Sequence, residues 1–420
     1  MLFSFFAQWF TDGFLRTDML DRNRNTSNHE IDLCQIYGLK ECKTDILRDK
    51  NGGKLKFQLI DGEMYPRYLF DVDATSNENW VFAENFEDLH DISALRAIYQ
   101  GTPEEQLKKM FAVGVEHGNS TIGHTIFNTI MLREHNRICD CLAAEYKNWD
   151  DERLFQTTRN ILNVILLRIV IRDYIKHISP ITFAADIIPG DAEKRPWYRT
   201  NRMSIEFNLL YRWHSMVPEQ FNVEADSYTL SDLRNNVPLV LEHGLGKLVN
   251  AASVQRAGKI GLGNTHHFFF VPLPFYDGGK SVMEVTVQMA RDAKLQSYNE
   301  YRKAFGLRAL RNFEELTDDP AFQQKLSTMY QGRIESVEWL VGIFAQKHGE
   351  GAMLGDLMTR MVGYDAFTQA LTNPLLSKYL YNEATFTKHG LREIEATDSL
   401  HDIFERNLSS FSGVHVSFKT

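Results

Sequence analysis

Apolar residues recur at three- and four-residue spacings from the first turn of the chain. Phe3, Phe6, Phe10 and Phe14 follow this pattern, which predicts an amphipathic helix with one aromatic face. The stretch Met1–Phe10 has no basic residue and no small-residue cleavage site, so it is not typical of a signal peptide. We therefore expect this helix to pack in the core.

The same spacing predicts two long helices, over residues 121–146 and 150–178. The second is apolar on much of its surface, which indicates a buried helix, and it ends before Pro180 because proline cannot continue a helix. Residues 19–65 have an irregular pattern, with a hairpin expected around residues 50–54. Shorter helical patterns cover residues 84–111, 203–215, 229–251, 281–294, 298–305, 312–316, 320–348 and 354–372.

Length and composition fit one large domain over residues 1–420, and no strand-rich region or internal repeat interrupts its helical pattern. The net charge of −9 argues against nucleic-acid binding, which needs a basic surface. The four cysteines form neither a disulfide framework nor a zinc spacing, which favours a reducing compartment. Because no apolar run reaches the roughly 20 residues that span a bilayer, we expect a cytoplasmic or peripheral-membrane location.

One pair of residues carries candidate chemistry. Tyr211 and His214 are three residues apart, and on a helix that spacing places both side chains on one face, about one turn apart. An imidazole can bind a haem iron, and a phenol beside the haem can lose an electron and a proton. A half-buried helix with a hydrogen-bonded histidine has the same pattern, so the pair alone leaves both interpretations open.

Longer motifs resemble one known family. The segment Leu132–Arg137, LREHNR, resembles the helix signature of animal-type haem peroxidases. The segment Glu206–His214, EFNLLYRWH, resembles the proximal haem helix of their cyclooxygenase and fatty-acid dioxygenase branch. Further matches lie at Leu59–Pro66, Asp151–Arg159, Asn299–Gly306 and Val416–Phe418. The resemblance covers the whole chain and implies the mainly α, single-domain fold of a cyclooxygenase-like haem peroxidase, with haem b as cofactor.

The resemblance also implies roles for single residues. His214 would be the proximal ligand of the haem iron, and Asn208 would support the haem from the same side. Tyr211, with Leu210 beside it as a supporting residue, would form the radical that takes a hydrogen atom from a polyunsaturated fatty acid. Dioxygen would then add to give a hydroperoxide. Tyr174 matches the tyrosine that hydrogen-bonds this radical tyrosine in cyclooxygenases, although an ordinary phenol at a helix end has the same pattern.

The distal side of the haem departs from the family. The segment Phe6–Asp12 resembles the distal haem helix and keeps its glutamine as Gln8, but the distal histidine is replaced by Asp12. That histidine moves a proton between the two peroxide oxygens, and an aspartate would do so only if burial raised its pKa. We hypothesise that His117, at a position that lines the distal pocket in relatives, replaces the missing base. A surface or loop histidine is the alternative.

Three further departures concern the substrate, and a fourth concerns haem attachment. Ala366 falls where cyclooxygenases carry the serine that aspirin acetylates, and Ile181 falls where they carry a tyrosine at the channel mouth. The arginine that pairs with the fatty-acid carboxylate would lie upstream of Met1. We therefore expect a single oxygenation and not the double oxygenation that yields prostaglandins. Ser120 stands where other relatives have an ester-forming carboxylate, which implies non-covalent haem, and we expect no calcium site.

The chain begins almost at the distal helix, so we expect its catalytic domain to lack an N-terminal part. Fatty acid, dioxygen and peroxide are the implied partners, and the resemblance leaves peripheral membrane contact and a homodimer open. Two alternatives compete with the dioxygenase. One is a haem peroxidase that acts on small reductants, and the other is a haem-binding protein with little turnover, which Asp12 and the short N-terminus favour.

Overall fold

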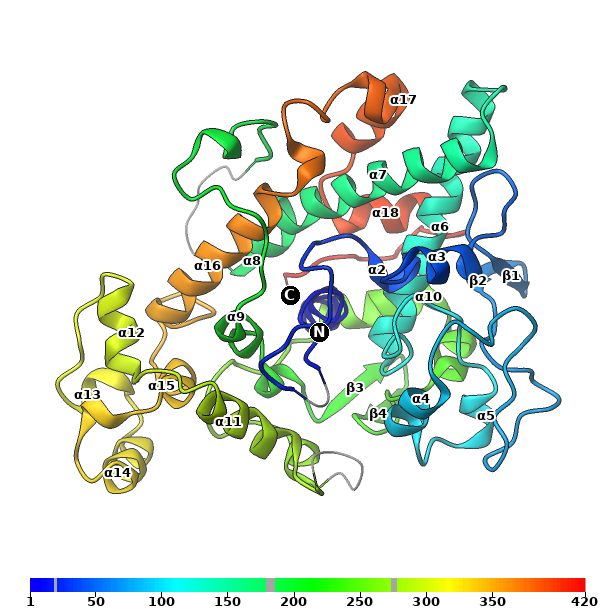
Figure 1. Cartoon of the computed structure of the whole chain (residues 1–420). Coiled ribbons are helices and arrows are strands. Elements are labelled where there is room, and N and C mark those ends of the chain that lie inside the picture. The colour runs from blue at the N-terminus through cyan, green and yellow to red at the C-terminus, as the bar shows by residue number, and fades with distance from the viewer. Residues whose placement is uncertain (19–20, 179–185, 273–277, 420) are drawn as a thin grey trace.

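The computed structural model describes residues 1–18, 21–178, 186–272 and 278–419, and Figure 1 shows their arrangement. Helices dominate these residues and confirm the predicted mainly α fold. The helices are α1 Leu2–Thr11, α2 Cys34–Tyr37, α3 Glu41–Leu47, α4 Ile92–Tyr99, α5 Glu104–Leu107, α6 Ile122–Glu145, α7 Asp151–Ile169, α8 Ile175–Ile178, α9 Ile205–Leu210, α10 Val237–Val254, α11 Val282–Asp292, α12 Tyr298–Ala304, α13 Phe313–Leu316, α14 Pro320–Met329, α15 Trp339–Ala345, α16 Asp356–Leu371, α17 Glu383–Glu395 and α18 Leu400–Asn407.

Two antiparallel hairpins make up the sheet structure of the described residues. The strands are β1 Phe57–Ile60, β2 Glu63–Pro66, β3 Gln220–Val223 and β4 Asp226–Thr229. Each pair is joined by two residues, Asp61-Gly62 in the first and Glu224-Ala225 in the second. The hairpin expected around residues 50–54 is present in a short form. An antiparallel bridge between Arg48 and Leu55 and a hydrogen bond from the Asp49 amide to the Lys54 carbonyl, at 2.9 Å, close the turn.

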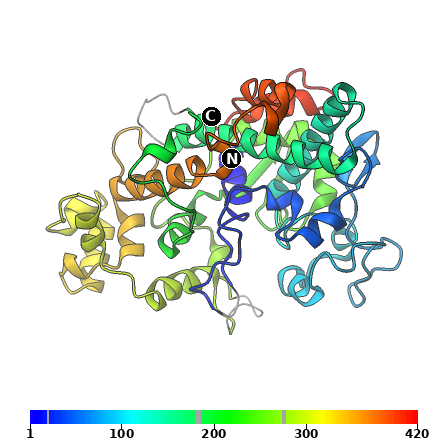
Figure 2. The same ribbon diagram turned by 45° about the horizontal axis from the view of Figure 1, so that its top comes forward.

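The N-terminal helix α1 lies in the middle of the molecule. Figures 1 and 2 both place it between α12–α14 at one end and α4–α5 at the other. Eight of its ten residues are buried, so it is a core helix, as expected, but it packs on most of its circumference and not on one aromatic face. Trp9 Nε1 ties it to α6 by donating a hydrogen bond to Asn128 Oδ1 at 2.8 Å.

The helices α6 and α7 pack against each other and confirm the two long helices predicted from the sequence. α7 continues through a π-helical turn, Val170–Tyr174, into α8. The stretch Asp151–Ile178 is long and apolar enough to cross a membrane, but 83% of its most apolar window is buried inside the molecule. It is therefore accounted for as a helix of the core.

Three predicted helices have different bounds in the structure. The pattern over 203–215 forms a helix only to Leu210, and the pattern over 229–251 becomes helical only at Val237 because the chain first completes β4. The pattern over 320–348 is split into α14 and α15, with Gly332 at φ +75° between them. Only a residue without a Cβ adopts that backbone conformation at little cost, which explains why the helix ends there.

Candidate active site

One face of α1 is polar although the helix lies in the centre of the molecule. Ser4, Gln8 and Asp12 are spaced four residues apart, so they form one stripe along the helix. Gln8 is exposed, and the Asp12 side chain keeps 35% of its exposure, whereas Phe6 and Trp9 between them are fully buried. An accessible polar stripe on a central helix is typical of the wall of a binding site.

Asp12 is held by a histidine that the sequence analysis missed. Its Oδ2 atom lies 2.8 Å from Nε2 of His124, a buried residue in the first turn of α6. The other ring nitrogen, Nδ1, lies 2.9 Å from Thr121 Oγ1. Both ring nitrogens are thus occupied, which fixes the orientation of the imidazole and of the carboxylate. The only sequence signal was a histidine three residues after a helix-capping threonine, a pattern that many core histidines share.

The environment of Asp12 does not meet the condition for a proton-donating acid. Burial alone would raise the pKa of Asp12, but the hydrogen bond and charge of His124, with the charges of His117 and Arg16, together lower it. The carboxyl is therefore ionised at neutral pH. The condition under which an aspartate could replace the distal histidine, a pKa raised by burial, is therefore not met in this environment.

His117 lies near this pair on the loop before α6. The residue is open to solvent on one side, but loss of hydration next to the surrounding protein atoms lowers the pKa of His117, and the Asp12 carboxylate only partly opposes that shift. Next to it, the Glu116 carboxylate pairs with Arg16 and has a pKa lowered to about 2. The sequence thus brings His117 and Asp12 into one electrostatic neighbourhood from segments about a hundred residues apart. The role of His117 as the distal base stays a prediction.

Tyr211 begins a break in the helix. It has φ −92° and ψ 14°, and Trp213 has ψ 43° before a 3₁₀ turn, His214–Met216. The rings of Tyr211 and Trp213 stack at 4.6 Å, which residues two apart on a continuous helix do not do. The expectation that Tyr211 and His214 share one helical face is therefore wrong.

Tyr174 completes the aromatic surroundings of Tyr211. It ends the π-helical turn, is fully buried, and stacks on Phe3 at 5.1 Å. Burial raises the pKa of Tyr174, and the neighbouring Tyr211 adds to that rise. Burial also raises the pKa of Tyr211, but there Tyr174 acts in the opposite direction and lowers it. The phenols are thus neighbours, but the Tyr174 hydroxyl makes no hydrogen bond of good geometry with a described residue. The expected pairing of the two hydroxyls is present as a hydrogen-bond contact of poor geometry, which raises the pKa of Tyr174 and lowers that of Tyr211.

His214 is a neutral imidazole in a distinct setting. Its ring stacks on Phe269 at 4.6 Å, and its Nδ1 atom lies 3.2 Å from Met283 Sδ. Burial, and to a smaller extent the Arg212 charge, lower its pKa to about 3. The side chain nevertheless remains partly accessible. A neutral, accessible imidazole whose Nδ1 is occupied leaves Nε2 free to bind a metal.

The remaining predicted residues have different surroundings. Asn208 is buried, donates from Nδ2 to Thr17 Oγ1 at 3.1 Å and accepts from Arg212 at 2.6 Å, so both ends of its amide are engaged within the protein. Leu210 is fully buried, and Ala366 is buried on α16, which packs against α9. Ile181 lies outside the described residues.

The donor set fits a haem. It offers one neutral, accessible histidine, His214, and a separate polar face made by Gln8, Asp12 and His117. Among the described residues, no hydrogen bond joins His214 to that face. A haem peroxidase needs one imidazole to bind the iron and polar groups for proton transfer, and the described residues supply both kinds of group.

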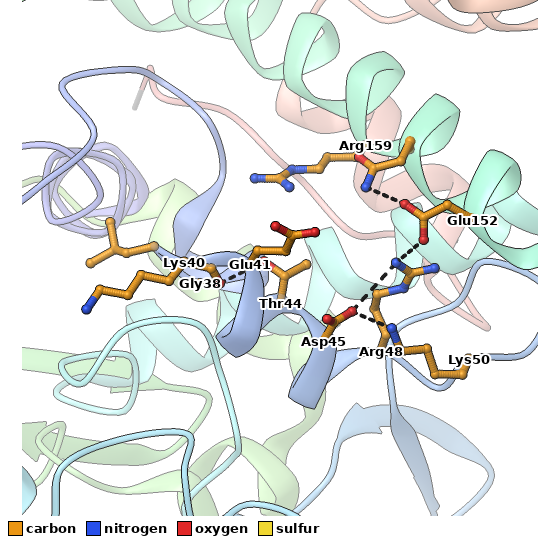
Figure 3. Close-up of a pocket in the computed structure, with 11 residues that line it drawn as sticks. Gly38, Lys40, Glu41, Thr44, Asp45, Arg48, Lys50, Glu152 and Arg159 are labelled. Carbon is orange, nitrogen blue, oxygen red and sulfur yellow. Dashed lines mark hydrogen bonds and ion pairs between the residues drawn. The ribbon is translucent and has the colours of Figure 1, made fainter.

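A cavity of about 470 Å³ lies elsewhere, between α3 and the start of α7 (Figure 3). Its walls are charged, and Arg48 there bonds Asp151 and Glu152 of α7. Figure 3 shows Arg159 pointing into it from α7. None of the predicted site residues lines this cavity, so it is separate from the candidate active site.

Comparison with known proteins agrees with this geometry. The family model described as animal haem peroxidase matches residues 14–417. The chain therefore belongs to the animal haem peroxidase family, which implies that it binds haem.

Among curated relatives, prostaglandin G/H synthase 2 of Gallus gallus is 34% identical over 99% of this chain and 64% of its own length. Prostaglandin G/H synthase 1 of Rattus norvegicus is 34% identical over 92% of this chain and 59% of its own length. The chain thus spans less than two thirds of these relatives.

Solved structures share the fold at lower identity. Peroxidase A from Dictyostelium discoideum superimposes with a TM-score of 0.72 at 21% identity, over 93% of this chain and 71% of its own. Fatty acid alpha-dioxygenase of Arabidopsis thaliana does so with a TM-score of 0.69 at 20% identity, over 91% and 61%.

Proposed function

We propose that this chain is a haem-dependent oxygenase that converts a polyunsaturated fatty acid into a hydroperoxide. The observation that carries the proposal is a partly accessible phenol, Tyr211, packed among aromatic rings beside a second buried phenol, Tyr174. The names of the similar prostaglandin G/H synthases and fatty acid alpha-dioxygenase support a fatty-acid substrate and dioxygen.

His214 is the residue that would hold the haem iron through Nε2, with Met283 and Phe269 fixing the ring. We propose that haem b is bound without a covalent link, because Ser120 has no carboxyl group to form an ester. When bound, the haem supplies the one-electron oxidant for a nearby phenol. The low pKa of His214 keeps its nitrogen lone pair available at every pH near neutrality.

Tyr211 would carry the radical. Because burial raises its pKa, its hydroxyl keeps its proton until an electron is removed, so electron and proton leave together. The tyrosyl oxygen then takes one hydrogen atom from the fatty acid, which re-forms the phenol and leaves a carbon radical. Dioxygen adds to that carbon, and the resulting peroxyl radical takes the hydrogen atom back from Tyr211 to give the hydroperoxide.

The walls around Tyr211 suit an acyl chain. Phe207 contacts its ring at 5.1 Å, and Phe14 stacks on Phe207 at 6.3 Å. Ala366 offers only a methyl group on the neighbouring helix. Aromatic and small apolar residues bind hydrocarbon, and the alanine at position 366, where cyclooxygenases carry a serine, is the basis on which we propose a single oxygenation.

The distal side supports slow peroxide chemistry. The ionised Asp12 is a poor proton acceptor, so His117, neutral at physiological pH and next to Asp12, is the proposed base. A haem protein with little turnover is the second candidate, and the observation that favours it is the lowered pKa of Asp12.

The test compares the haem-loaded chain with Tyr211→Phe. Oxygen uptake with linoleate and a trace of hydroperoxide should be abolished in the variant, while the Soret band is unchanged. Tyr298→Phe, which removes another buried hydroxyl far along the chain, should keep normal uptake. If Tyr211→Phe retains uptake, the radical mechanism is wrong, and if the wild type shows haem but no uptake, the second candidate is correct.

A further inference from the structure

Four metal-ligating side chains meet where α17 passes the C-terminal half of α6. Cys141 and Glu145 are four residues apart on α6, and His389 and Glu393 are four residues apart on α17. Each pair therefore lies on one helical face. The Sγ atom of Cys141 and one ligand atom each of His389 and Glu393 lie within 4.8 Å of one another.

The histidine is oriented as metal-binding histidines are. Its Nδ1 atom lies 3.1 Å from Glu145 Oε2, and its Nε2 atom lies 3.3 Å from Glu393 Oε1. Nε2 is buried and has no hydrogen-bond partner of good geometry among the described residues. A carboxylate on one ring nitrogen fixes the tautomer and turns the lone pair of the other nitrogen toward a metal. Here that lone pair faces a carboxylate oxygen, an arrangement that a cation between them would stabilise.

Neighbouring arginines leave this position open. Arg137 Nη2 donates to Glu393 Oε2 at 2.6 Å. The other carboxylate oxygen, Oε1, is the one that lies near His389, and its contact with Arg137 is longer, at 3.5 Å. Arg137 Nη1 also lies 3.7 Å from Cys141 Sγ, where its charge opposes the rise that burial causes in the pKa of the thiol. Arg392 lies 3.5 Å from His389 Nδ1 and 3.7 Å from Glu145 Oε2. The shorter contact of Nδ1 is to Glu145, which favours a proton on Nδ1 and none on Nε2.

The dimensions match a tetrahedral ion. Zinc binds histidine nitrogen and carboxylate oxygen at about 2.1 Å, and a tetrahedral angle then separates the two ligand atoms by about 3.4 Å. The observed separation of His389 Nε2 and Glu393 Oε1 is 3.3 Å. The Cys141 Sγ atom lies within 4.8 Å of a ligand atom of each of the other two residues, and a thiolate binds zinc at about 2.3 Å.

We propose that Cys141, His389 and Glu393 bind a zinc-type divalent transition-metal ion, with Glu145 orienting His389 and Arg137 supporting Glu393. Three protein ligands leave a fourth position for water. The ion joins α17 to α6, far along the chain from Tyr211 and His214. The competing arrangement without metal is a protonated His389 that bridges Glu145 and Glu393.

The test uses the full haem-loaded chain. Zinc affinity is measured by competition with a chromophoric chelator, and X-ray absorption is recorded at the zinc edge, which the haem iron does not obscure. We expect one zinc per chain, one sulfur at about 2.3 Å and nitrogen or oxygen neighbours at about 2.0 Å. Cys141→Ser should remove the sulfur and most of the affinity, and Glu145→Gln should weaken binding about 10–100-fold.

Cys42→Ser is the matched control, because Cys42 is an exposed thiol on α3, and it should bind zinc as the wild type does. Melting temperatures of the metal-free variants show whether each still folds. A wild-type absorption spectrum without a sulfur neighbour overturns the proposal, whatever the variants do. Unchanged zinc affinity in a folded Cys141→Ser variant also overturns it.

Discussion

The aromatic surroundings of Tyr211 and the polar face of α1 differ in how their polar groups are bonded. Around Tyr211 the neighbours are rings, and the hydroxyl of Tyr174 is buried without a hydrogen bond of good geometry. Around Asp12 the polar groups are paired, and His124 is held at both ring nitrogens. The residues around Tyr211 match the family motif, whereas on the polar face Asp12 stands where the family has a histidine.

Electrostatics explain what the difference means for chemistry. Burial dominates on the aromatic side and raises the pKa of both phenols, so they stay neutral until oxidised. On the polar side the influence of His124 overcomes burial and keeps Asp12 ionised. The described residues thus provide a neutral phenol, Tyr211, in one region and a fixed anion, Asp12, in the other, and His117 is the proposed base beside that anion.

The largest expected effect removes the proposed iron ligand. His214→Gln should lower haem affinity by more than the roughly 10–100-fold that loss of an outer-shell partner costs, because it takes away the ligand itself. Haem titration followed at the Soret band measures this. His243→Gln, which changes a histidine bonded to Tyr228 on the β3–β4 hairpin side, should bind haem normally. Equal affinity in the two variants would show that His214 is not the ligand.

The next effect concerns the polar face. His117→Ala should slow peroxide consumption by the haem-loaded chain about 100-fold, the lower end of the contribution of a general acid–base. His401→Ala changes a histidine on α18 whose ring packs edge-to-face against Phe411 and should leave the rate unchanged. If His117→Ala consumes peroxide at the wild-type rate, the distal base is another group or the wild-type rate needs none.

Sequence patterns predicted the long helices but not the breaks that shape the site. The helices α6 and α7 carry many turns of one period, so their existence was evident. The helix breaks at Tyr211, where the rings of Tyr211 and Trp213 stack, and the spacing of apolar residues does not report contacts of this kind.

In the candidate site too, some residues could be predicted from the sequence and others could not. The motifs identified His214 and Tyr211 because they are contiguous in the sequence. Asp12 was visible as a departure, but its partner His124 is 112 positions away, and the consequence of Asp12 depends on that partner. The role of a single substituted residue in a binding site therefore needs its spatial neighbours.

A smaller effect tests the pairing of Asp12. His124→Leu leaves the carboxylate without its hydrogen-bond donor, so we expect the free energy of unfolding at pH 7 to fall by about 2 kcal/mol, the range for a hydrogen bond to a charged group. Chemical denaturation of the haem-free chain measures it. Thr125→Val, a substitution at a neighbouring buried hydroxyl of α6 without a hydrogen-bond partner, is the control and should be close to neutral.

The pH dependence of the same pair has a defined sign. The pKa of Asp12 is lower in the folded chain than its ordinary value of 3.8. The stability it contributes is therefore fully present above pH values near 3.8 and is lost as the pH falls through the lower folded pKa. The advantage of the wild type over Asp12→Asn should be constant near neutrality and shrink in acid. An advantage that grows in acid would show that the pKa of Asp12 is raised.

The smallest effect is expected at Tyr174. Loss of a polar group among the aromatic residues should change stability less than loss of one beside Asp12. Tyr174→Phe removes a buried hydroxyl that makes no good hydrogen bond, so stability should be unchanged or higher by up to about 1 kcal/mol. Oxygen uptake should fall only a few-fold, since Tyr211 remains. Tyr37→Phe removes a buried hydroxyl that bonds His135 at 2.8 Å and should cost stability. If Tyr174→Phe is the more destabilised of the two, the Tyr174 hydroxyl is bonded in solution, and the contrast between the two sides of the site is weaker than this structure indicates.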